Sequence, residues 1–443
     1  MSVKFEKTWW WVIGAVILVA VIGVAVFLNF NFNNNSTDTS SIDIDNGDTK
    51  IDWDAYPSYT IKLTGSYNIT APGTYYLSGE ISDGGISIKV ADNAVVRLVL
   101  ENVTIKNSSG PAIACYEGDD LVIELKGENY LEDGTKYASS YDEDVNGVIY
   151  SKADLTLEGD GRLTVKANYN DGIVSKDDLK INGGIYNIVA KDDGIRGKDS
   201  VYIVDGDITV EAKGDGIKST NETEITKGFV LIAGGKINIA KSYEGLEARQ
   251  IIIDGGVISI LANDDGINAG TKEDAYISIN GGEIYVNAAG DGIDSNGYIY
   301  FNGGTTLVDG PTNSGNGALD AGVQIIQNGG VVIAAGASGM AENLGASSAI
   351  YNVGIFFSLT LPANTEISIK SSDGVEVINY TSAKTFSHLA AGTPQFKKGE
   401  TYNIYVDGEK YDSFTISDIV TTVGQNTAIP GGGLQPGGGG PRR

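Results

Sequence analysis

The sequence predicts an all-β fold, a right-handed parallel β-helix in which the short strands of successive coils stack on one another. An acid followed by a glycine and an aliphatic residue recurs at Asp171, Asp193 and Asp215, 22 residues apart. Apolar positions alternate before each corner, as at Ile208 and Val210, and a period of two residues indicates a strand. Repeats of this length, made of short strands and glycine turns, are typical of a solenoid whose coils stack about 4.8 Å apart.

The repeat keeps its register on one side and varies in length on the other. The corner returns at Glu244, Asp265 and Asp291, and a glycine lies nine residues before each corner acid from 193 to 291. The added residues fall between a corner and the next such glycine, at 218–228 and 268–275. A stacked coil permits a longer loop there while its strands stay aligned. A β-sandwich, the alternative, would not place the same residue types at the same offset in coil after coil.

The first 51 residues predict a membrane anchor and a stalk. Residues 9–28 carry no charge and as a helix would span about 30 Å, the thickness of the hydrocarbon core. Lys4 and Lys7 precede this segment and the next basic residue is Lys50, so residues 1–8 are expected in the cytoplasm and the bulk of the chain outside the cell. A cleaved signal peptide is the alternative, but no small-x-small cleavage site follows the apolar run. Residues 29–51, rich in Asn, Ser, Thr and Asp, are expected to form a flexible stalk.

The remaining chain predicts three further regions. Residues 52–345 are expected to form the β-helix, with irregular coils at its start. Residues 346–424 read as strands of a small C-terminal β cap, and the glycine- and proline-rich tail, 425–443, is expected to be disordered.

Composition excludes several classes of function. The net charge of -26 disfavours binding to nucleic acid and to anionic membrane surfaces. The single cysteine, Cys115, excludes a disulfide framework. The single histidine, His388, lies in the expected cap, which excludes a Ser-His-Asp site in the repeats and a His-rich metal site anywhere.

The corner acids predict a column of carboxylates. Two carboxylates about 4.8 Å apart repel by about 3 kcal/mol at an effective dielectric constant near 20, so something must offset the repulsion. Three offsets are available: the backbone N–H groups of the acid's own turn, a neighbouring basic side chain, or calcium, which takes six to eight oxygen ligands. We expect calcium as the cofactor. Its predicted ligands are Asp171, Asp178, Asp192, Asp193, Asp199, Asp215, Asp264, Asp265 and Asp291.

A second column is basic. Lys152, Lys176, Lys198 and Arg249 recur at matching offsets after the corners. They either pair with neighbouring acids or bind the carboxylates of an acidic polysaccharide. Tyrosines expected to face outward either stack on sugar rings or reflect the ordinary preference of tyrosine for strands. They are Tyr169, Tyr243, Tyr285, Tyr298 and Tyr300.

Residues 59–423 resemble a clostridial-type family of carbohydrate-binding right-handed parallel β-helix domains, which bind cellulose and acidic sugars. The resemblance rests on NGVIYSKADLTLEGDGRLTV, NYNDGIVSKDDLKINGG, KDDGIRGKDSV, GDGIKS and KKGETYNIYVDG. It implies calcium at acidic turns, similarity to calcium-dependent pectate lyases and no established catalytic role. The fifth coil departs from the pattern with Glu244 and Leu246, which weakens the prediction of a metal at that level.

These observations favour a monomeric, single-pass, cell-surface protein that contains calcium and binds cellulose or an acidic polysaccharide of the polygalacturonate type, such as a plant cell-wall glycan. We expect no catalytic residues. The alternative is a calcium-dependent, pectate-like polysaccharide lyase in which Lys176 or Lys198 abstracts the proton next to the uronate carboxylate. A third possibility is an adhesin or a surface-layer component.

Overall fold

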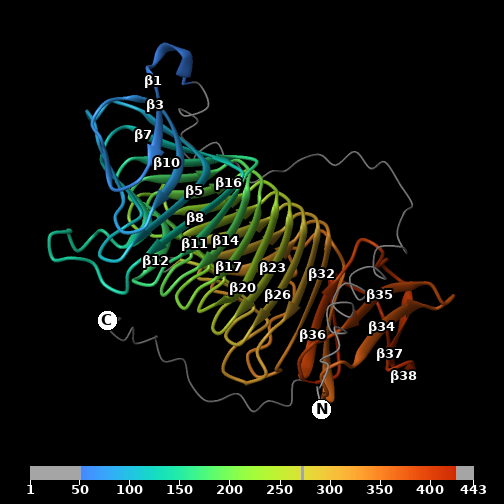
Figure 1. Ribbon diagram of the computed structural model, residues 1–443. Helices are drawn as coiled ribbons and strands as arrows, with labels where there is room; N and C mark the ends of the chain where they lie inside the picture. Colours follow the sequence, from blue (N-terminus) through green and yellow to red (C-terminus); the bar gives the residue numbers. More distant parts are fainter. Residues whose placement is uncertain (1–50, 271–273, 426–443) are drawn as a thin grey trace, which may run out of the picture. The chain divides into compact units, whose positions relative to one another are not determined.

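The computed structural model describes residues 51–270 and 274–425, all within the compact unit Ser40–Arg443. The anchor expected at 9–28 lies outside these residues, as do nearly all of the stalk and the tail. The part of the chain that is described contains no helix long and apolar enough to cross a membrane. Apart from the 3-10 helix η3 (Trp53–Ala55), its regular structure is β, which confirms the all-β prediction (Figure 1).

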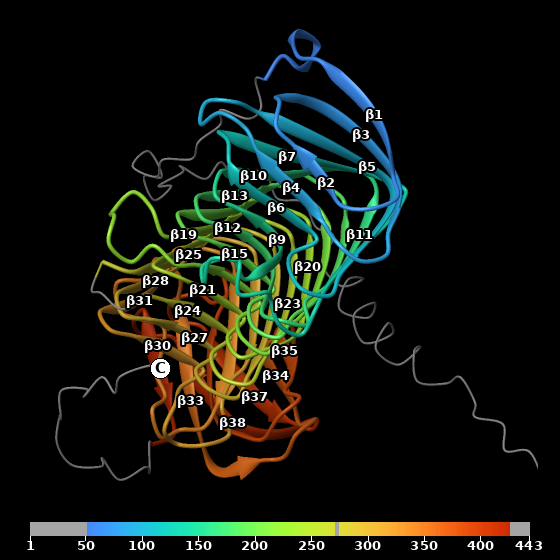
Figure 2. The same cartoon turned by 60° about the vertical axis from the view of Figure 1, so that its left-hand side comes forward.

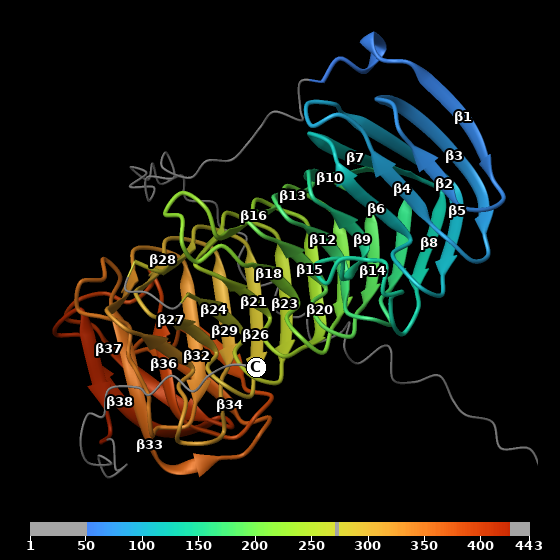
Figure 3. The same cartoon turned by 90° about the vertical axis from the view of Figure 1, so that its left-hand side faces the viewer.

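Each coil contributes one strand to an eleven-stranded sheet, sheet B, in which every neighbouring pair is parallel (Figure 3). Its strands are β2 (Tyr67–Ile69), β4 (Ile86–Lys89), β6 (Ile113–Glu117), β9 (Gly147–Ser151), β12 (Asp171–Ser175), β15 (Ile195–Gly197), β18 (Ile217–Ser219), β21 (Leu246–Ala248), β24 (Ile267–Ala269), β27 (Ile293–Ser295) and β30 (Leu319–Ala321).

The other two strands of each coil belong to a larger sheet, sheet A, and form two faces. The first face contains β7 (Asp120–Lys126), β10 (Asp154–Gly159), β13 (Asp178–Ile181), β16 (Ser200–Ile203), β19 (Phe229–Ile232), β22 (Gln250–Ile253), β25 (Tyr276–Ile279), β28 (Tyr298–Phe301) and β31 (Gln324–Gln327). The second face contains β8 (Glu128–Asp133), β11 (Arg162–Lys166), β14 (Ile185–Val189), β17 (Asp207–Glu211), β20 (Lys236–Ser242), β23 (Val257–Ala262), β26 (Glu283–Ala288), β29 (Thr305–Asp309) and β32 (Val331–Gly336). At the N-terminal end, β1 (Ser58–Leu63), β3 (Gly73–Ile81) and β5 (Val96–Asn107) are parallel neighbours, and β5 pairs with both β7 and β8.

The register confirms the parallel solenoid that the repeat predicts. Ile195 pairs with Ile173 of the preceding coil and with Ile217 of the following one, so equivalent residues stack. The inward positions form one continuous apolar core along the stack. Aligning the sequence on its corner acids therefore gives the observed register, and each repeat position becomes a column of side chains along the solenoid. Figures 1 and 2 show the stacked coils.

Two sets of glycines permit this close stacking. Gly256 has a φ of 96°, and a Cβ there would lie 2.9 Å from the carbonyl oxygen of Gly235 in the preceding coil. The corner glycines instead have no room: a Cβ on Gly194 would lie 2.6 Å from the carbonyl oxygen of Gly216. Glycine is thus required for different reasons at the two positions. Nine residues before the corner acid the backbone needs a positive φ, and directly after the acid there is no space for a Cβ.

Beyond β32 the chain changes from parallel to mixed pairing. β36 (Phe386–Gly392) lies antiparallel to both β32 and β33 (Asn352–Leu361), and β39 (Val420–Val423) lies parallel to β33. Four antiparallel strands form sheet C: β34 (Glu366–Ser371), β35 (Glu376–Thr381), β37 (Thr401–Val406) and β38 (Glu409–Thr415). The strands from β33 to β39 contribute to a second apolar core, which also includes outward-facing residues of β29 and β32.

One buried carboxylate joins this C-terminal region to the coils. Asp309, at the end of β29, is 1% exposed. Its carboxylate accepts hydrogen bonds from the hydroxyls of Tyr285, Tyr380 and Ser382 and from the N–H of Ala383. A buried charge with this many donors is stabilised, so Asp309 fixes the segment after β35 on the last coils.

Candidate functional site

The corner acids form the predicted column, and we call it the corner column. Five of its six carboxylates accept a hydrogen bond from the backbone N–H of the corner residue in the next coil, not from their own turns as the capping alternative assumed, whereas Glu244 accepts from the side chain of Asn268. The N–H groups of Asp193, Asp215 and Glu244 lie 3.1, 2.9 and 3.1 Å from the Oδ1 atoms of Asp171, Asp193 and Asp215. Further along, the N–H groups of Asp291 and Gly317 lie 2.6 and 2.5 Å from Oδ1 of Asp265 and Asp291. The backbone of one coil thus holds the acid of the coil before it.

A second column, which the sequence analysis missed, lies three residues after the corner acid, on sheet B. We call it the strand column. Its members are register partners in turn: Arg196, Lys218, Glu247, Asn268, Asp294 and Asp320. The column therefore begins with basic residues and continues with acids and one amide. Its side chains are half-buried.

The basic members pair with two of the first three corner acids, Asp171 and Asp215. Asp193, between them, has no ion pair in the described residues, and burial raises its pKa to about 6. The guanidinium of Arg196 lies 2.6 Å from Oδ2 of Asp171, whose side chain is fully buried. The ammonium of Lys218 lies 2.7 Å from Oδ2 of Asp215 and also pairs with Glu247. Burial by itself would raise the pKa of Asp215, but hydrogen bonds and the charge of Lys218 hold that pKa below its usual value. In these coils the protein supplies its own cation.

The later coils lack such a cation. Asp265, Asp291, Asp294, Asp320 and Glu342 have no ion-pair partner within 4.0 Å anywhere in 51–270 and 274–425. Burial raises the pKa of Asp265 and of Asp294 to about 7 each, and neighbouring carboxylates contribute. It also raises the pKa of Asp291 to about 6 and that of Glu342 to about 7. Here the fold places carboxyl groups together without neutralising them.

Four groups of carboxylates have oxygen atoms within 4.8 Å of one another, the arrangement that a hard cation with several oxygen ligands requires. They are Asp154, Asp177 and Asp178; Asp215, Glu244 and Glu247; Glu244, Asp264 and Asp265; and Asp265, Asp291 and Asp294. Lys218 already occupies the second group. The last group lies where the corner column and the strand column are both acidic.

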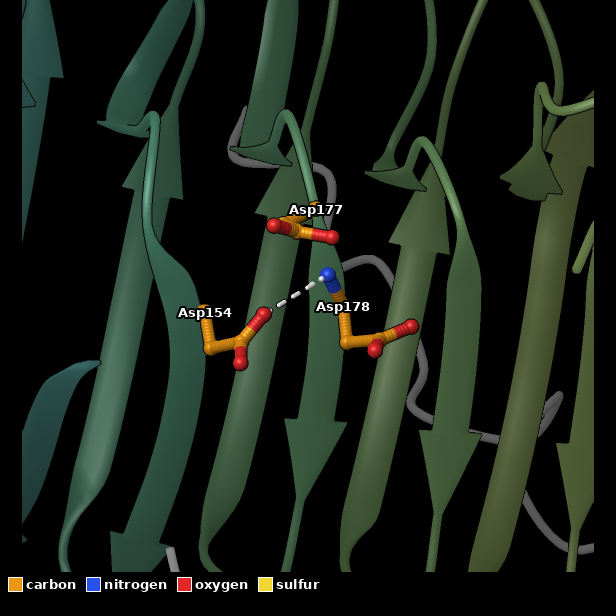
Figure 4. A group of neighbouring side chains, drawn as sticks. All are labelled: Asp154, Asp177 and Asp178. Carbon is orange, nitrogen blue, oxygen red and sulfur yellow. Dashed lines mark hydrogen bonds between the residues drawn. The ribbon is translucent and has the colours of Figure 1, made fainter. Parts of the chain in front are cut away.

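Figure 4 shows the first group, at the start of the first face of sheet A. The N–H of Asp178 donates to Oδ1 of Asp154 at 3.1 Å. Burial raises the pKa of Asp154 to about 8 and that of Asp177 to about 6. Asp178 also accepts a hydrogen bond from the hydroxyl of Ser200, so the protein itself already uses part of this group.

The predicted metal ligands thus divide into two sets. The groups above include Asp178, Asp215, Asp264, Asp265 and Asp291. They do not include Asp171, Asp192, Asp193 or Asp199. Asp199 is held by Lys227 at 2.6 Å and Lys198 at 3.4 Å, and its pKa is about 2, because these hydrogen bonds and charges outweigh its burial. The groups add five residues that were not predicted as ligands: Asp154, Asp177, Glu244, Glu247 and Asp294. Glu244 is itself a corner acid, and the position of the others in the repeat is visible once the coils are aligned on their corners.

The four residues of the basic column occupy one repeat position, directly after a strand of sheet B, as predicted. After β18 the same position is occupied by Thr220, so the basic column is not continuous. Lys152 and Lys198 are exposed. Arg249 is 5% exposed; it donates to the carbonyl oxygen of Glu224 and pairs with Asp274, so it links the two inserted loops. Burial and the nearby guanidinium of Arg196 lower the pKa of Lys176, and no acid lies within 4.0 Å of its ammonium in the described residues.

The family model and one relative that match this chain carry the same description. A family model described as "Carbohydrate-binding domain-containing protein" matches residues 64–314 and 248–401. A protein of Acetivibrio thermocellus with the same description is 39% identical over 127 residues, which cover 28% of this chain and 44% of that protein. The match therefore spans less than half the length of this relative. A solved structure, described as the polysaccharide lyase-like protein from C. thermocellum in a gadolinium derivative, has 31% identity and a TM-score of 0.45, covering 55% of this chain and 95% of that chain.

Proposed function

Because the chain belongs to the family of carbohydrate-binding domain-containing proteins, we propose that it binds an acidic polysaccharide of the polygalacturonate type through calcium at its later corners. The observation that carries the proposal is the group of Asp265, Asp291 and Asp294, whose oxygens lie within 4.8 Å of one another and face no protein cation. Calcium fits this donor set because it binds carboxylate oxygens and tolerates irregular geometry.

The spacing of the coils suits a charged polymer. Corner acids repeat at about 4.8 Å along the solenoid, and a polyuronate repeats its carboxylates along its length. Without a cation the two would repel each other, since both are anionic and the chain carries a net charge of -26. Calcium held by Asp291 and Asp294 has ligand positions left for a uronate carboxylate. Lys152, Lys176 and Lys198, which follow β9, β12 and β15, add positive charge beside earlier strands of the same sheet.

Affinity electrophoresis in gels that contain polygalacturonate tests this proposal. We expect retardation of the protein in millimolar calcium and at least about tenfold weaker binding in EDTA. The variant Asp291→Asn/Asp294→Asn should behave in calcium like the wild type in EDTA. The matched control, Asp205→Asn/Asp207→Asn, removes the same charge from exposed positions on the second face of sheet A and should bind like the wild type or better. Binding that EDTA leaves unchanged would contradict the calcium bridge.

A lyase activity is the second candidate, and one observation favours it. Lys176 has a lowered pKa and no acid within ion-pair distance in the described chain, which are properties of a proton-abstracting lysine. Formation of unsaturated uronide, followed by its absorbance and abolished in Lys176→Ala but not in Lys152→Ala, would establish the lyase. We expect binding without product, because Lys176 is one member of a periodic column.

We further propose that residues 9–28 hold the protein in the cell membrane with its coils outside. Twenty uncharged residues behind Lys4 and Lys7 support this. N-terminal sequencing of the protein from native membranes should find the segment intact. A mature N-terminus between residues 29 and 51 would identify a cleaved signal peptide instead.

A further inference from the structure

The outer side of the first face of sheet A carries a second apolar layer. Val230 and Ile251 point into the main core. Their neighbours in sequence must point outward because side chains alternate along a strand. Yet the outward residues Phe229, Leu231 and Ile252 are only 1%, 4% and 0% exposed, and they form a separate apolar cluster. An outward face of a solenoid is expected to be polar, so this layer requires an explanation.

Tyrosines surround the layer. Tyr202 of β16 and Tyr276 of β25 pack against it from the coils before and after. Tyr298 of β28 is the register partner of Tyr276, and the rings of Tyr298 and Tyr300 lie 5.5 Å apart with 16° between their planes. All four side chains are half-buried. None of their hydroxyls hydrogen-bonds to another residue of the described chain, so all four are available to a ligand.

A row of polar side chains borders the tyrosines at the turn that follows these strands. Asn280 donates from Nδ2 to Oδ1 of Asp254 at 2.7 Å, Asn302 donates to Asn280 at 2.8 Å, and Asn328 donates to Asn302 at 2.8 Å. The row has one member per coil and the same repeat as the tyrosine face. Consecutive coils thus present apolar rings beside amide groups (Figure 2 labels β19, β25, β28 and β31 on this side).

The outward columns of this face carry no charge from β16 to β31, although two charged groups lie at its borders: Asp254 in the polar row, and Lys180 of the preceding strand β13, whose ammonium lies 5.8 Å from the ring centroid of Tyr202. Two outward columns run through the six strands from β16 to β31, and none of their twelve residues is acidic or basic. The columns are Ser200, Phe229, Gln250, Tyr276, Tyr298 and Gln324, and Tyr202, Leu231, Ile252, Ser278, Tyr300 and Ile326. In a chain with 57 acids, such a face favours a neutral ligand and offers no countercharge to an anionic one.

We propose that Tyr202, Tyr276, Tyr298 and Tyr300 form a binding surface for a neutral pyranose chain, separate from the acidic corners. Aromatic rings bury the apolar C–H face of a sugar ring, while phenol and amide groups hydrogen-bond to its hydroxyls. The proposal rests on the carbohydrate-binding function but requires neither calcium nor the corner acids. It assigns neutral and acidic sugars to different faces of the same coils.

The test uses the full chain in detergent and the soluble probe cellohexaose, with binding measured by calorimetry. We expect binding that EDTA leaves unchanged. Tyr298→Ala/Tyr300→Ala should weaken it at least about tenfold, whereas Tyr298→Phe/Tyr300→Phe should retain most of it. The control Tyr76→Ala, at a tyrosine that is 44% exposed on β3, should have no effect. Binding of polygalacturonate by the double alanine variant should stay at the wild-type level, which separates this proposal from the preceding one.

A second measurement needs no variant. In the wild-type protein, cellohexaose should slow the nitration of Tyr298 and Tyr300 by tetranitromethane, measured by peptide mass spectrometry, and leave that of Tyr76 unchanged. The proposal is overturned if the wild type does not bind cellohexaose, or if nitration of both tyrosines is unaffected. It is also overturned if EDTA or Asp291→Asn removes the binding, because the neutral sugar would then occupy the acidic corners.

Discussion

Replacing Asp294 with asparagine should change the stability of the protein in opposite directions with and without calcium. Burial and the carboxylates of Asp320, Asp291 and Asp265 raise the pKa of Asp294 to about 7. Because this value lies above that of the unfolded chain, the stability contributed by the group is fully present below about pH 4. It is lost as the pH rises through about 7. Without a cation, the folded protein at pH 8 therefore carries an unfavourable charge at Asp294.

The magnitude follows from the difference between the folded pKa and the model value of 3.8. That difference corresponds to about 4 kcal/mol. The side chain is only half-buried, so solvent screening reduces the figure, and we take about 2 kcal/mol. In EDTA at pH 8, Asp294→Asn should stabilise the protein by about this amount and raise its melting temperature by a few degrees. When the calcium concentration is one hundred times the Kd for calcium, binding raises the free energy of unfolding of the wild type by about 2.7 kcal/mol. The variant should lose most of this stabilisation.

Thermal unfolding followed by circular dichroism at pH 5 and pH 8, in EDTA and in calcium, measures both effects. The exposed control Asp205→Asn should shift the melting temperature little under all four conditions. At pH 5 the wild type is protonated at Asp294, so the stabilisation by the substitution should nearly vanish there. A variant that is destabilised equally in EDTA and in calcium would refute the reasoning, because Asp294 would then act through packing alone.

Three further substitutions test the fold. Gly256→Ala should destabilise the protein by about 1 kcal/mol or more in urea unfolding, because φ is 96° and the new Cβ would lie 2.9 Å from the carbonyl oxygen of Gly235. Asp309→Ala should cost about 3 kcal/mol or more by leaving four donors, of which the hydroxyls of Tyr380 and Ser382 are buried, without their acceptor, and hydrogen exchange should rise first at 376–392. Arg249→Ala should increase proteolysis within 220–228 and 270–275 without weakening polygalacturonate binding, because its guanidinium holds Asp274 and the first of these loops.

The fold could be read from the sequence because a solenoid repeats its local rules. Each coil places a turn glycine, alternating apolar residues and a corner acid at fixed offsets, and parallel pairing then aligns equal positions. The turn glycines confirm the prediction of a tight turn at this offset, because Gly256 and the glycines at the same repeat position adopt a positive φ. The corner column follows from the same alignment, which is why its members were predicted correctly as neighbours.

The chemistry of the column could not be read in the same way. Whether a corner acid has a protein cation beside it depends on the strand-column residue of its own coil, as for Asp215, or of the next coil, as for Asp171. That residue varies from Arg196 to Asp294 without any period. The role of Arg249 depends on two inserted loops that belong to no repeat. Lys198 likewise pairs with Asp199, next to it in sequence, although periodicity alone places it beside Lys176. Repeat position fixes where a side chain lies but not what it contacts.

One column of acids is therefore stabilised in two ways along the same solenoid. In the coils around Asp171 and Asp215 the cations are Arg196 and Lys218, which belong to the chain and cannot leave. In the coils around Asp265 and Asp291 the strand column provides an amide, Asn268, and an acid, Asp294, so any cation must come from solution. Because each coil contacts only its neighbours, chelation should loosen the later coils before the earlier ones. Hydrogen exchange in EDTA should accordingly rise between 262 and 345 while 171–219 stays protected, and uniform protection along all coils would show that the later acids are satisfied by the protein alone.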